Sequence, residues 1–285
     1  MKKIISLILV LTMAICGCFA LTACNNNEQG EIVVFTNAFF APFEYYDGTE
    51  IAGVDVDIMN LVGQSLGKTV VYENKDFGTL INYVQEGTLC DCAAAGFTIT
   101  SERMEKVNFS VTYYTSVQYV IIAKDSMTTN TANDDETCFY WSQLGGKKIG
   151  VQLDTTGNIY VQGEIDGWEE GVDGELTGTN AECTAYDDAQ LAYEALKAGQ
   201  IDCIVVDELP SKYLIKNDAA TYEAYALYYD ADTATLEEYG IAVNKNQTEL
   251  LTAINAVLNT LLADVDENGK NGVEQLVMAH FGLDG

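Results

Sequence analysis

The sequence predicts an α/β protein built from two lobes, and three observations lead to this prediction. The chain has 285 residues, which is comfortable for two domains with a core each. Strand-like runs and helical patterns alternate along the chain, as they do in α/β proteins. The β-α-β pattern occurs twice in succession, so each half of the chain can build its own sheet. A hydrophobic content of 48% and an aromatic content of 10% exclude a disordered chain.

The first set of elements opens with a β-rich run at residues 32–36. Apolar residues then recur at helical spacing from Val54 to Leu66, and Gly67 follows as a helix end. The elements after this helix are a strand at 70–73, a helix at 78–86 closed by Gly87, a buried strand at 92–95, a helix opening near 100–102 and a strand at 116–123. Residues 124–137 are polar and acidic and form the clearest predicted loop.

The second set repeats the pattern. Its predicted elements are a strand at 148–152, a helix at 155–164, a surface excursion at 167–179, an amphipathic helix at 187–198, a buried strand at 201–206, a strand at 239–243 and helices at 247–262 and 273–281. Ligands of such sheets bind beyond the carboxyl ends of the strands, where the N-termini of the helices point. A cleft between the two lobes is therefore the expected site.

The charge balance excludes several classes of function. The chain has 14 Lys and Arg against 43 Asp and Glu, for a formal net charge of −29. A nucleic-acid binder or a protein held to anionic lipid by a basic face needs local positive charge, so neither is expected. His280 is the single histidine. Catalysis by several histidines and a His-rich metal site are therefore excluded.

The N-terminus predicts export. Lys2 and Lys3 precede an apolar run at 4–20, the pattern of a secretory signal peptide. The run ends in Leu21-Thr22-Ala23-Cys24, which resembles a bacterial lipobox. That resemblance implies a lipoprotein signal peptide at 1–23, cleavage before Cys24, diacylglycerol on its thiol and a lipidated tether at 24–30. Two or three acyl chains give stable membrane anchoring. The alternative is a plain signal peptide followed by an incidental cysteine.

The other cysteines indicate no metal or redox site. No CxxC pair occurs among them, which argues against a zinc or thioredoxin-type site. Buried free thiols are the favoured interpretation, with a Cys183–Cys203 bridge between neighbouring strands left open. Residues 264–269 match the first half of an EF-hand loop, but Gln275 stands where the final Glu is required. We therefore expect no metal and no cofactor.

Several segments together resemble a known family. The most specific is Ala95-Gly96-Phe97-Thr98-Ile99-Thr100-Ser101-Glu102-Arg103. The others, in order, are 36–44, 53–57, 108–110, 113–114, 150–152, 155–157, 202–207 and 239–243. They resemble the polar amino-acid substrate-binding proteins of ABC importers, extracellular solute-binding protein family 3, over nearly all of residues 31–285.

This resemblance implies a type II periplasmic-binding-protein-like fold with the ligand cleft between its lobes. Lobe I would comprise 31–114 and 238–285, and lobe II 115–237. Crossing strands near Tyr114–Thr115 and Glu237–Tyr239 would join them. The resemblance also implies a turn between the two C-terminal helices, where the EF-hand-like residues lie.

A free amino acid presents a carboxylate and an ammonium, so its site needs a fixed cation and a fixed anion. Arg103 stands in the first turn of a predicted helix, where its guanidinium and exposed N–H groups can hold a carboxylate. Thr98 and the backbone of Gly96 can add donors or acceptors. Asp207 ends a buried strand and would face the cleft. The resemblance implies that Arg103 binds the ligand carboxylate and Asp207 the ammonium; a surface arginine and a helix N-cap are the alternatives.

Other predicted ligand contacts come from both lobes. Thr156, like its neighbour Thr155, can close over the carboxylate or cap the next helix. The resemblance places Phe40 and Phe77 on either side of the ligand, whereas ordinary core packing is the alternative. Gln152, with Gln118 and Val206, would face the side-chain pocket. Asn37 stands where family members selective for basic amino acids often carry Asp. The neutral amide argues modestly against Lys, Arg or His as the ligand. It favours polar neutral amino acids, including cystine or glutamine.

The function implied is capture of a free amino acid between the lobes and its delivery to the permease subunits of an ABC importer. The protein would be a monomer, outside the cytoplasm, and attached to the cell membrane by lipid at Cys24. A cyclohexadienyl or arogenate dehydratase-like enzyme shares the fold, but it needs a general acid or base in the cleft, and none appears at the matched positions. We therefore predict no enzyme. A ligand-sensing module is the other alternative, and no downstream transmembrane or signalling segment favours it.

Overall fold

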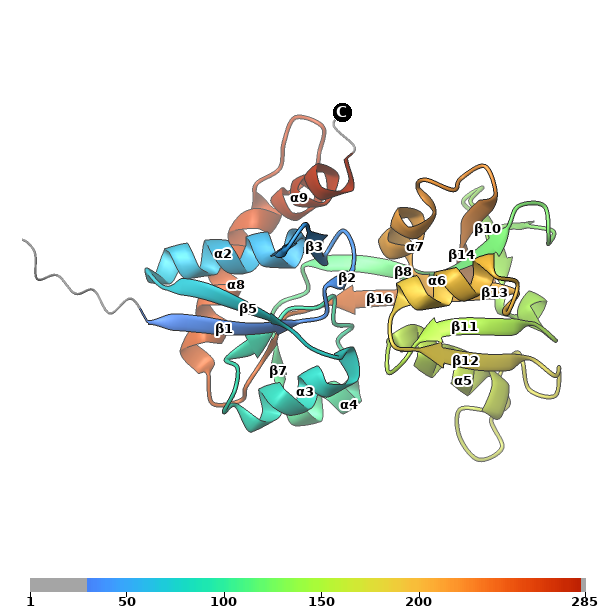
Figure 1. Cartoon of the computed structure of the whole chain (residues 1–285), viewed down its shortest axis with the longest axis horizontal. Coiled ribbons are helices and arrows are strands. Elements are labelled where there is room, and N and C mark those ends of the chain that lie inside the picture. The colour runs from blue at the N-terminus through green and yellow to red at the C-terminus, as the bar shows by residue number, and fades with distance from the viewer. Residues whose placement is uncertain (1–29, 283–285) are drawn as a thin grey trace, which may run out of the picture. The chain divides into compact units, whose positions relative to one another are not determined.

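Two β-sheets divide the chain into two lobes, as the sequence predicts (Figure 1). The computed structural model describes residues 30–282. The predicted signal peptide and the lipidated Cys24 lie outside these described residues. From Ile32 onward the chain forms one unit. Within residues 30–282, no helix is long and apolar enough to cross a membrane.

The first lobe is built on a five-stranded sheet of order β5-β1-β6-β17-β7. Its strands are β1 (Glu31–Thr36), β5 (Thr69–Asn74), β6 (Cys92–Ala93), β7 (Asn108–Phe109) and β17 (Ala242–Val243). Its helices are α2 (Val54–Leu66), α3 (Phe77–Glu86), α4 (Ser101–Lys106), α8 (Thr248–Ala263) and α9 (Gly272–Phe281). A small sheet of β2 (Phe39–Phe40), β3 (Glu44–Asp47) and β4 (Glu50–Ala52) lies between β1 and α2 in the sequence.

Alternate residues of β1 explain how helices cover both faces of this sheet. Ile32 and Val34 pack in a core with α2 and α8, whereas Phe35 packs with α3. The predicted glycine ends are confirmed, because Gly67 and Gly87 follow α2 and α3 with φ of 63° and 64°. A left-handed residue at these positions lets the backbone N–H bond to the last turn, and glycine adopts it without steric cost.

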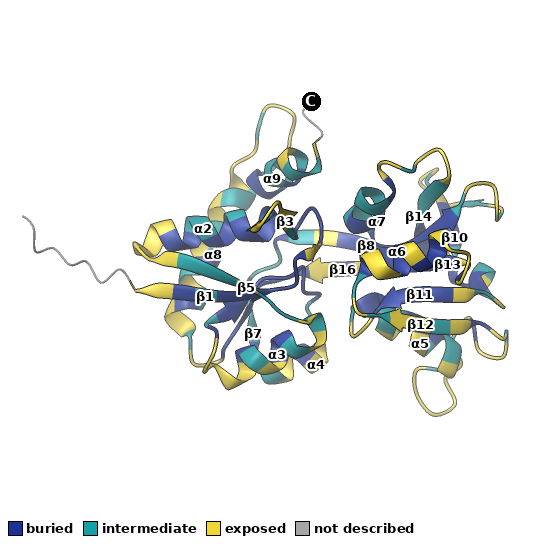
Figure 2. Cartoon of the chain, viewed as in Figure 1, coloured by how far each residue is buried: buried dark blue, intermediate teal, exposed yellow. Residues whose placement is uncertain are grey.

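The second lobe is built on a nine-stranded sheet whose main order is β12-β11-β13-β8-β14-β10-β9. Its strands are β8 (Tyr114–Ala123), β9 (Asn130–Thr131), β10 (Thr137–Tyr140), β11 (Lys148–Gln152), β12 (Glu182–Tyr186), β13 (Cys203–Asp207), β14 (Tyr222–Asp230), β15 (Thr233–Ala234) and β16 (Leu236–Tyr239). Its helices are η1 (Trp141–Leu144), α5 (Thr156–Asp166), α6 (Ala189–Lys197) and α7 (Glu208–Ile215). The inner strand β13 is buried throughout, whereas the edge strand β12 is largely exposed (Figure 2).

Two antiparallel strands run between the lobes. β16 pairs with the start of β8, from Leu236 opposite Val117 to Tyr239 opposite Tyr114. Farther along, β8 pairs with β13, which puts Gln118 opposite Asp207. A single long strand therefore connects the region between the lobes with the centre of the second sheet.

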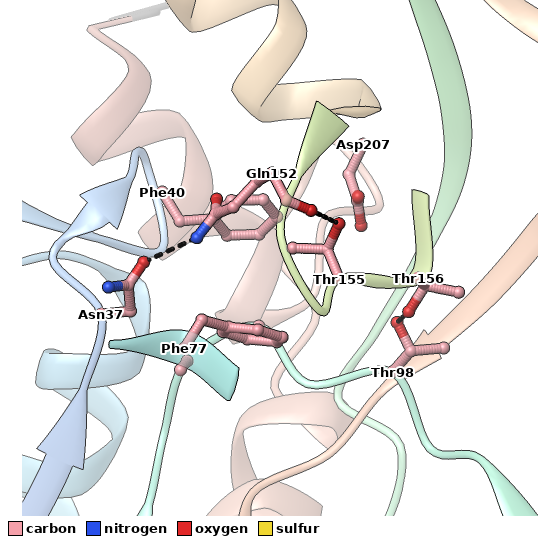
Figure 3. Close-up of a pocket in the computed structure, with 10 residues that line it drawn as sticks. Asn37, Phe40, Phe77, Thr98, Gln152, Thr155, Thr156 and Asp207 are labelled. Atoms are coloured by element: carbon pink, nitrogen blue, oxygen red, sulfur yellow. Dashed lines mark hydrogen bonds between the residues drawn. The ribbon is translucent and has the colours of Figure 1, made fainter. Parts of the chain in front are cut away.

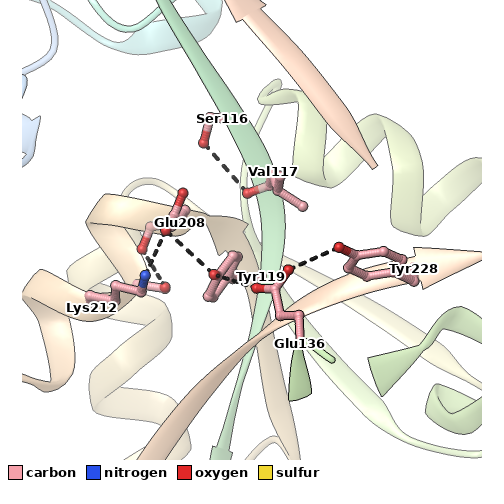
Figure 4. A network of polar contacts seen from close by, with 8 residues as sticks. Ser116, Val117, Tyr119, Glu136, Glu208, Lys212 and Tyr228 are labelled. Atoms are coloured by element: carbon pink, nitrogen blue, oxygen red, sulfur yellow. Dashed lines mark hydrogen bonds and ion pairs between the residues drawn. The ribbon is translucent and has the colours of Figure 1, made fainter. Parts of the chain in front are cut away.

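A polar network fastens α7 to β8 (Figure 4). The Tyr119 hydroxyl on β8 lies 3.4 Å from a carboxylate oxygen of Glu208 and 3.4 Å from one of Glu136, and its single proton is shared between the two acceptors. Lys212 donates to Glu208 at 2.6 Å, and its ammonium lies 5.0 Å from the centre of the Tyr119 ring. Because α7 begins directly after Asp207, these contacts help to hold the end of β13 in place.

The open alternative of a Cys183–Cys203 bridge is wrong. Ile149 of β11 pairs with Cys183 on one side and with Cys203 on the other, so a whole strand separates the two cysteines. Both are free thiols.

The residues resembling an EF-hand loop form a turn between α8 and α9, as the family resemblance implies. One carboxylate oxygen of Asp266 accepts the backbone N–H groups of Asn268 at 2.9 Å and Lys270 at 2.8 Å. Asp266 thus stabilises the turn itself.

Candidate functional site

A small cavity with a mixed polar and apolar lining lies between the lobes, at the carboxyl ends of strands from both sheets (Figure 3). Its volume is about 20 Å³. It is lined by Asn37, Phe40, Phe77, Ala95, Gly96, Thr98, Gln152, Thr155, Thr156 and Asp207. Apart from Arg103, Gln118 and Val206, every residue predicted to contact the ligand therefore lines this one cavity. Their role in ligand binding stays a prediction.

Direct hydrogen bonds join the lobes across the cavity. The side-chain amide of Gln152 donates to the carbonyl oxygen of the Asn37 side chain at 2.9 Å. The Thr156 hydroxyl donates to the Thr98 hydroxyl at 2.8 Å. A volume of about 20 Å³ is enough for a water molecule and too small for an amino acid. Entry of a ligand therefore requires these cross-lobe contacts to separate.

Gly96 lies where the backbone after β6 approaches the Phe40 ring closely. Its φ is +55°, and an added Cβ would lie 2.7 Å from the Phe40 ring. Its N–H donates to Asp55 at 3.0 Å, and the other oxygen of that carboxylate accepts the Tyr113 hydroxyl at 2.6 Å. Glycine at this position lets the Phe40 ring line the cavity.

Beneath this backbone, Asp55 lies near a second buried acid. Both carboxyl oxygens of Glu44 are buried and have no hydrogen-bond partner among the described residues. Burial, followed by the charge of Asp55, holds the pKa of Glu44 well above its usual value. Burial likewise raises the pKa of Asp55 to about 6. The first lobe thus contains a buried acid pair in which burial raises both pKa values.

Asp207 faces the cleft, since its side chain does not cap α7. It accepts hydrogen bonds from the Gln118 amide at 2.7 Å and from the Tyr239 hydroxyl. The N-cap alternative is therefore not the geometry observed. Thr155, by contrast, does cap α5, because its hydroxyl oxygen accepts the N–H of Asn158 at 3.3 Å.

Arg103 lies in a neighbouring pocket of about 300 Å³, which it lines together with Phe77 and Asp154. Its Nη1 donates to the Thr98 carbonyl at 2.9 Å, and its Nη2 donates across the lobes to the Asp154 carbonyl at 3.4 Å. The guanidinium carbon is 5.4 Å from the ring centre of Phe77. Because Phe77 lines both spaces, the arginine is adjacent to the small cavity but not part of its wall.

Sequence reasoning missed Glu237 as a site residue. This side chain is 2% exposed. It accepts the Thr98 hydroxyl at 2.6 Å and the Gln118 amide at 2.6 Å. The hydrophobic pattern of this strand gives no signal for it, because Glu237 is buried while Leu236 and Glu238 are exposed.

Two amide oxygens near the cavity complete the polar groups of the cleft. The side-chain oxygens of Gln118 and Gln152 are buried without a hydrogen-bond partner among the described residues. An added Cβ at Gly157 would lie 2.8 Å from the Gln118 oxygen. A buried acceptor without a partner is costly unless a donor reaches it, so these oxygens suit a ligand that brings N–H groups.

Two lobes with a cavity between them define the class of two-lobed solute-binding proteins. The particular family follows from the sequence: the model of the bacterial extracellular solute-binding proteins, family 3, matches residues 32–268, and the chain belongs to this family.

Curated relatives carry several ligand names. A probable histidine-binding protein of Neisseria gonorrhoeae is 26% identical over 95% of this chain and 94% of that protein. The L-cystine-binding protein TcyJ of Escherichia coli strain K12 is 26% identical over 90% of this chain and 85% of TcyJ. The arginine-binding extracellular protein ArtP of Bacillus subtilis is 32% identical over 51% of this chain, and this match spans 55% of ArtP.

Solved structures agree in fold. The substrate-binding protein of an amino acid ABC transporter superposes with a TM-score of 0.68 at 27% identity, covering 89% of this chain and 100% of that chain. An ancestral arginine-binding protein bound to glutamine gives a TM-score of 0.69 at 27% identity, covering 90% of this chain and 100% of that one.

Proposed function

We propose that this protein is the extracytoplasmic substrate-binding component of an ABC importer, which captures a free amino acid between its lobes and delivers it to the permease. The observation that carries the proposal is that an acidic and a basic side chain from different lobes lie around one cleft. Asp207 on the second lobe faces the cavity, and Arg103 on the first lobe lies beside it. A zwitterionic amino acid needs such a pair of charges.

The cross-lobe hydrogen bonds supply the closing mechanism. Separation of the lobes releases Nη2 of Arg103 from Asp154 and the Thr156 hydroxyl from Thr98. These donors then become available to a ligand carboxylate. Since the ligand contacts both lobes at once, it favours the closed arrangement through contacts that the open one lacks. Strands β8 and β16, at Tyr114–Thr115 and Glu237–Tyr239, are the hinge.

Polar neutral amino acids remain the favoured ligand class. Asn37 is a neutral amide whose nitrogen donates to the Lys75 carbonyl at 2.8 Å and whose oxygen accepts Gln152 at 2.9 Å. It thus brings no charge to the pocket for a basic side chain. The relatives named for arginine, histidine and cystine make L-arginine, L-histidine, L-cystine and L-glutamine the first compounds to test.

A thermal-shift panel over the amino acids tests the proposal, because binding to the native state alone raises its melting temperature. We expect a clear rise with one or a few L-amino acids and none with the D-enantiomers. No rise with any amino acid refutes the proposed function. Chemical conversion of a bound compound, followed by mass spectrometry, would instead establish the dehydratase-like enzyme.

Attachment to the membrane belongs to the same proposal and rests on the lipobox-like segment before Cys24. Replacing Cys24 with alanine should move the protein from the membrane to the soluble fraction of cells. Retention in the membrane fraction would refute the lipid anchor and leave the ligand site untouched.

A further inference from the structure

The backbone of the first lobe holds Glu44 and Asp55 against each other. The first two N–H groups of α2 donate to the carbonyl oxygens of Pro42 and Phe43 at 3.1 and 3.0 Å. Glu44 follows directly as the first residue of β3, and Asp55 is the second residue of α2. Glu44 is 0% exposed and Asp55 1%. The two carboxyl groups therefore share one buried environment, although they belong to different elements.

The two carboxyl groups have unequal hydrogen-bond partners. Asp55 accepts the Gly96 N–H at 3.0 Å and the Tyr113 hydroxyl at 2.6 Å. It also stands in the first turn of α2, where the helix dipole favours a negative charge. Glu44 accepts no hydrogen bond among the described residues, and a buried carboxylate without donors is costly. A protonated Glu44 is instead a donor, and Asp55 lies within its hydrogen-bonding reach.

No cation offsets a second negative charge in this pair. Neither acid forms an ion pair within residues 30–282. The charged groups that face Glu44 are both acids, Asp55 on α2 and Asp207 at the end of β13, and the Tyr113 phenol is neutral. Burial, followed by the charge of Asp55, holds the pKa of Glu44 well above its usual value, whereas burial raises the pKa of Asp55 only to about 6. Near neutral pH the pair therefore has one proton, and Glu44 holds it.

The pair supports two residues of the cavity wall. Glu44 pairs with Phe40 across the hairpin of β2 and β3, and Asp55 holds the N–H of Gly96. Phe40 and Gly96 are in close contact, since a Cβ added to Gly96 would lie 2.7 Å from the Phe40 ring. Both residues line the cavity between the lobes. The distance between the two carboxyl groups is therefore linked to the shape of this wall.

We propose that Glu44 is a positioning residue that keeps a proton and donates it to the Asp55 carboxylate, and that this hydrogen bond holds Phe40 and Gly96 in place to receive an amino acid. The proposal rests on the proposed function of the cleft. While Glu44 is protonated, binding leaves the charge of the pair unchanged. Once Glu44 ionises, the two carboxylates repel each other and the wall is displaced. Binding then takes up one proton from solvent to restore the pair, so affinity falls with rising pH by up to about tenfold per pH unit.

The first test is calorimetry of the whole protein with L-arginine, L-histidine, L-glutamine and L-cystine from neutral to alkaline pH. Glu44→Gln keeps a donor to Asp55 that cannot ionise, so it should retain most of the affinity at neutral pH and exceed the wild type at alkaline pH. Glu44→Leu keeps the bulk but has no donor, and it should lose about tenfold or more. Glu50→Gln, at an exposed position of the same small sheet, should match the wild type. Deprotonation of the ligand affects all variants alike, so the ratio of their affinities isolates Glu44.

The second test needs no amino acid and also serves if Glu44→Leu fails to fold. Near neutral pH, the infrared difference between the wild type and Glu44→Gln should contain a protonated carboxyl band, and the difference between the wild type and Glu50→Gln should not. Lack of this band, wild-type affinity in Glu44→Leu, or a pH profile of Glu44→Gln equal to that of the wild type overturns the positioning role while the proposed function stands. Absence of binding in the wild type overturns the proposed function, and the infrared band then still decides whether Glu44 holds the proton.

Discussion

Replacing Arg103 with alanine should weaken amino-acid binding severely. Nη1 of this residue is already occupied by the Thr98 carbonyl at 2.9 Å, whereas Nη2 makes only a long contact of 3.4 Å with Asp154. At least one charged hydrogen bond to the ligand carboxylate is therefore available from Nη2. Such a bond is worth about 1.5–3 kcal/mol, which corresponds to a loss of roughly 10- to 150-fold in affinity.

The loss should come from the missing cation and not from a damaged fold. Arg103 also lies over the rings of Phe77 and Phe97, each at 5.4 Å from the guanidinium carbon. Arg103→Lys keeps the charge but not the planar donor pair, so it should retain only part of the affinity. Lys68→Ala removes an exposed cation of the same lobe and serves as the control.

Isothermal titration calorimetry with each amino acid that raises the melting temperature provides the measurement, and urea unfolding of the same variants reports their stability. A correctly folded Arg103→Ala protein that binds within twofold of the wild type would refute the assignment of Arg103 to the ligand carboxylate. An equal loss of affinity in Lys68→Ala would show that the net charge of the protein, and not the Arg103 side chain, governs affinity.

Two further predictions concern stability. Trp141 is completely buried, and its indole N–H donates to the Thr235 hydroxyl at 2.9 Å. In urea unfolding, Trp141→Ala should lower the free energy of unfolding by about 3–5 kcal/mol, and Trp141→Phe should lower it clearly less. Equal losses of stability in the two variants would contradict this account. Burial raises the pKa of Asp55 from 3.8 to about 6, so the folded state holds this proton more tightly than the unfolded state does. As pH rises from about 4 to about 6, the ionisation of Asp55 should therefore lower the free energy of unfolding by on the order of 3 kcal/mol. Asp55→Asn should therefore gain stability relative to the wild type across that range, and parallel pH profiles of the two proteins would contradict the raised pKa.

Elements with a local signal were predicted well. The helices α2 and α3 have an apolar period and a glycine end, and β11 coincides with the predicted strand at 148–152. The strand β14 was missed. Its sequence Tyr-Glu-Ala-Tyr-Ala-Leu-Tyr-Tyr-Asp has no clean alternation, because its first four residues are only half-buried. Its place is decided by pairing with β8 and β10, which are distant in sequence.

Site residues, too, divide into those with a local sequence signal and those placed by contacts distant in sequence. Segments around Gly96, Gln152 and Asp207 carry recognisable patterns, and the structure brings them to one cavity. Glu237 stands in an acidic run that resembles a solvated strand. Only its register against Ser116 turns it inward, and register is a property of the assembled sheet. The side-chain direction of Arg103 depends in the same way on the aromatic rings packed beneath it.

The position of β17 in the first sheet has a consequence for how the protein is made. This strand lies between β6 and β7, yet its residues follow the entire second lobe in the sequence. During synthesis, β6 therefore has an open edge until nearly the whole chain has emerged, and open strand edges invite wrong pairing. The second sheet, by contrast, is drawn from one continuous stretch of chain. Folding should thus finish in the first lobe, after the last helices have been made.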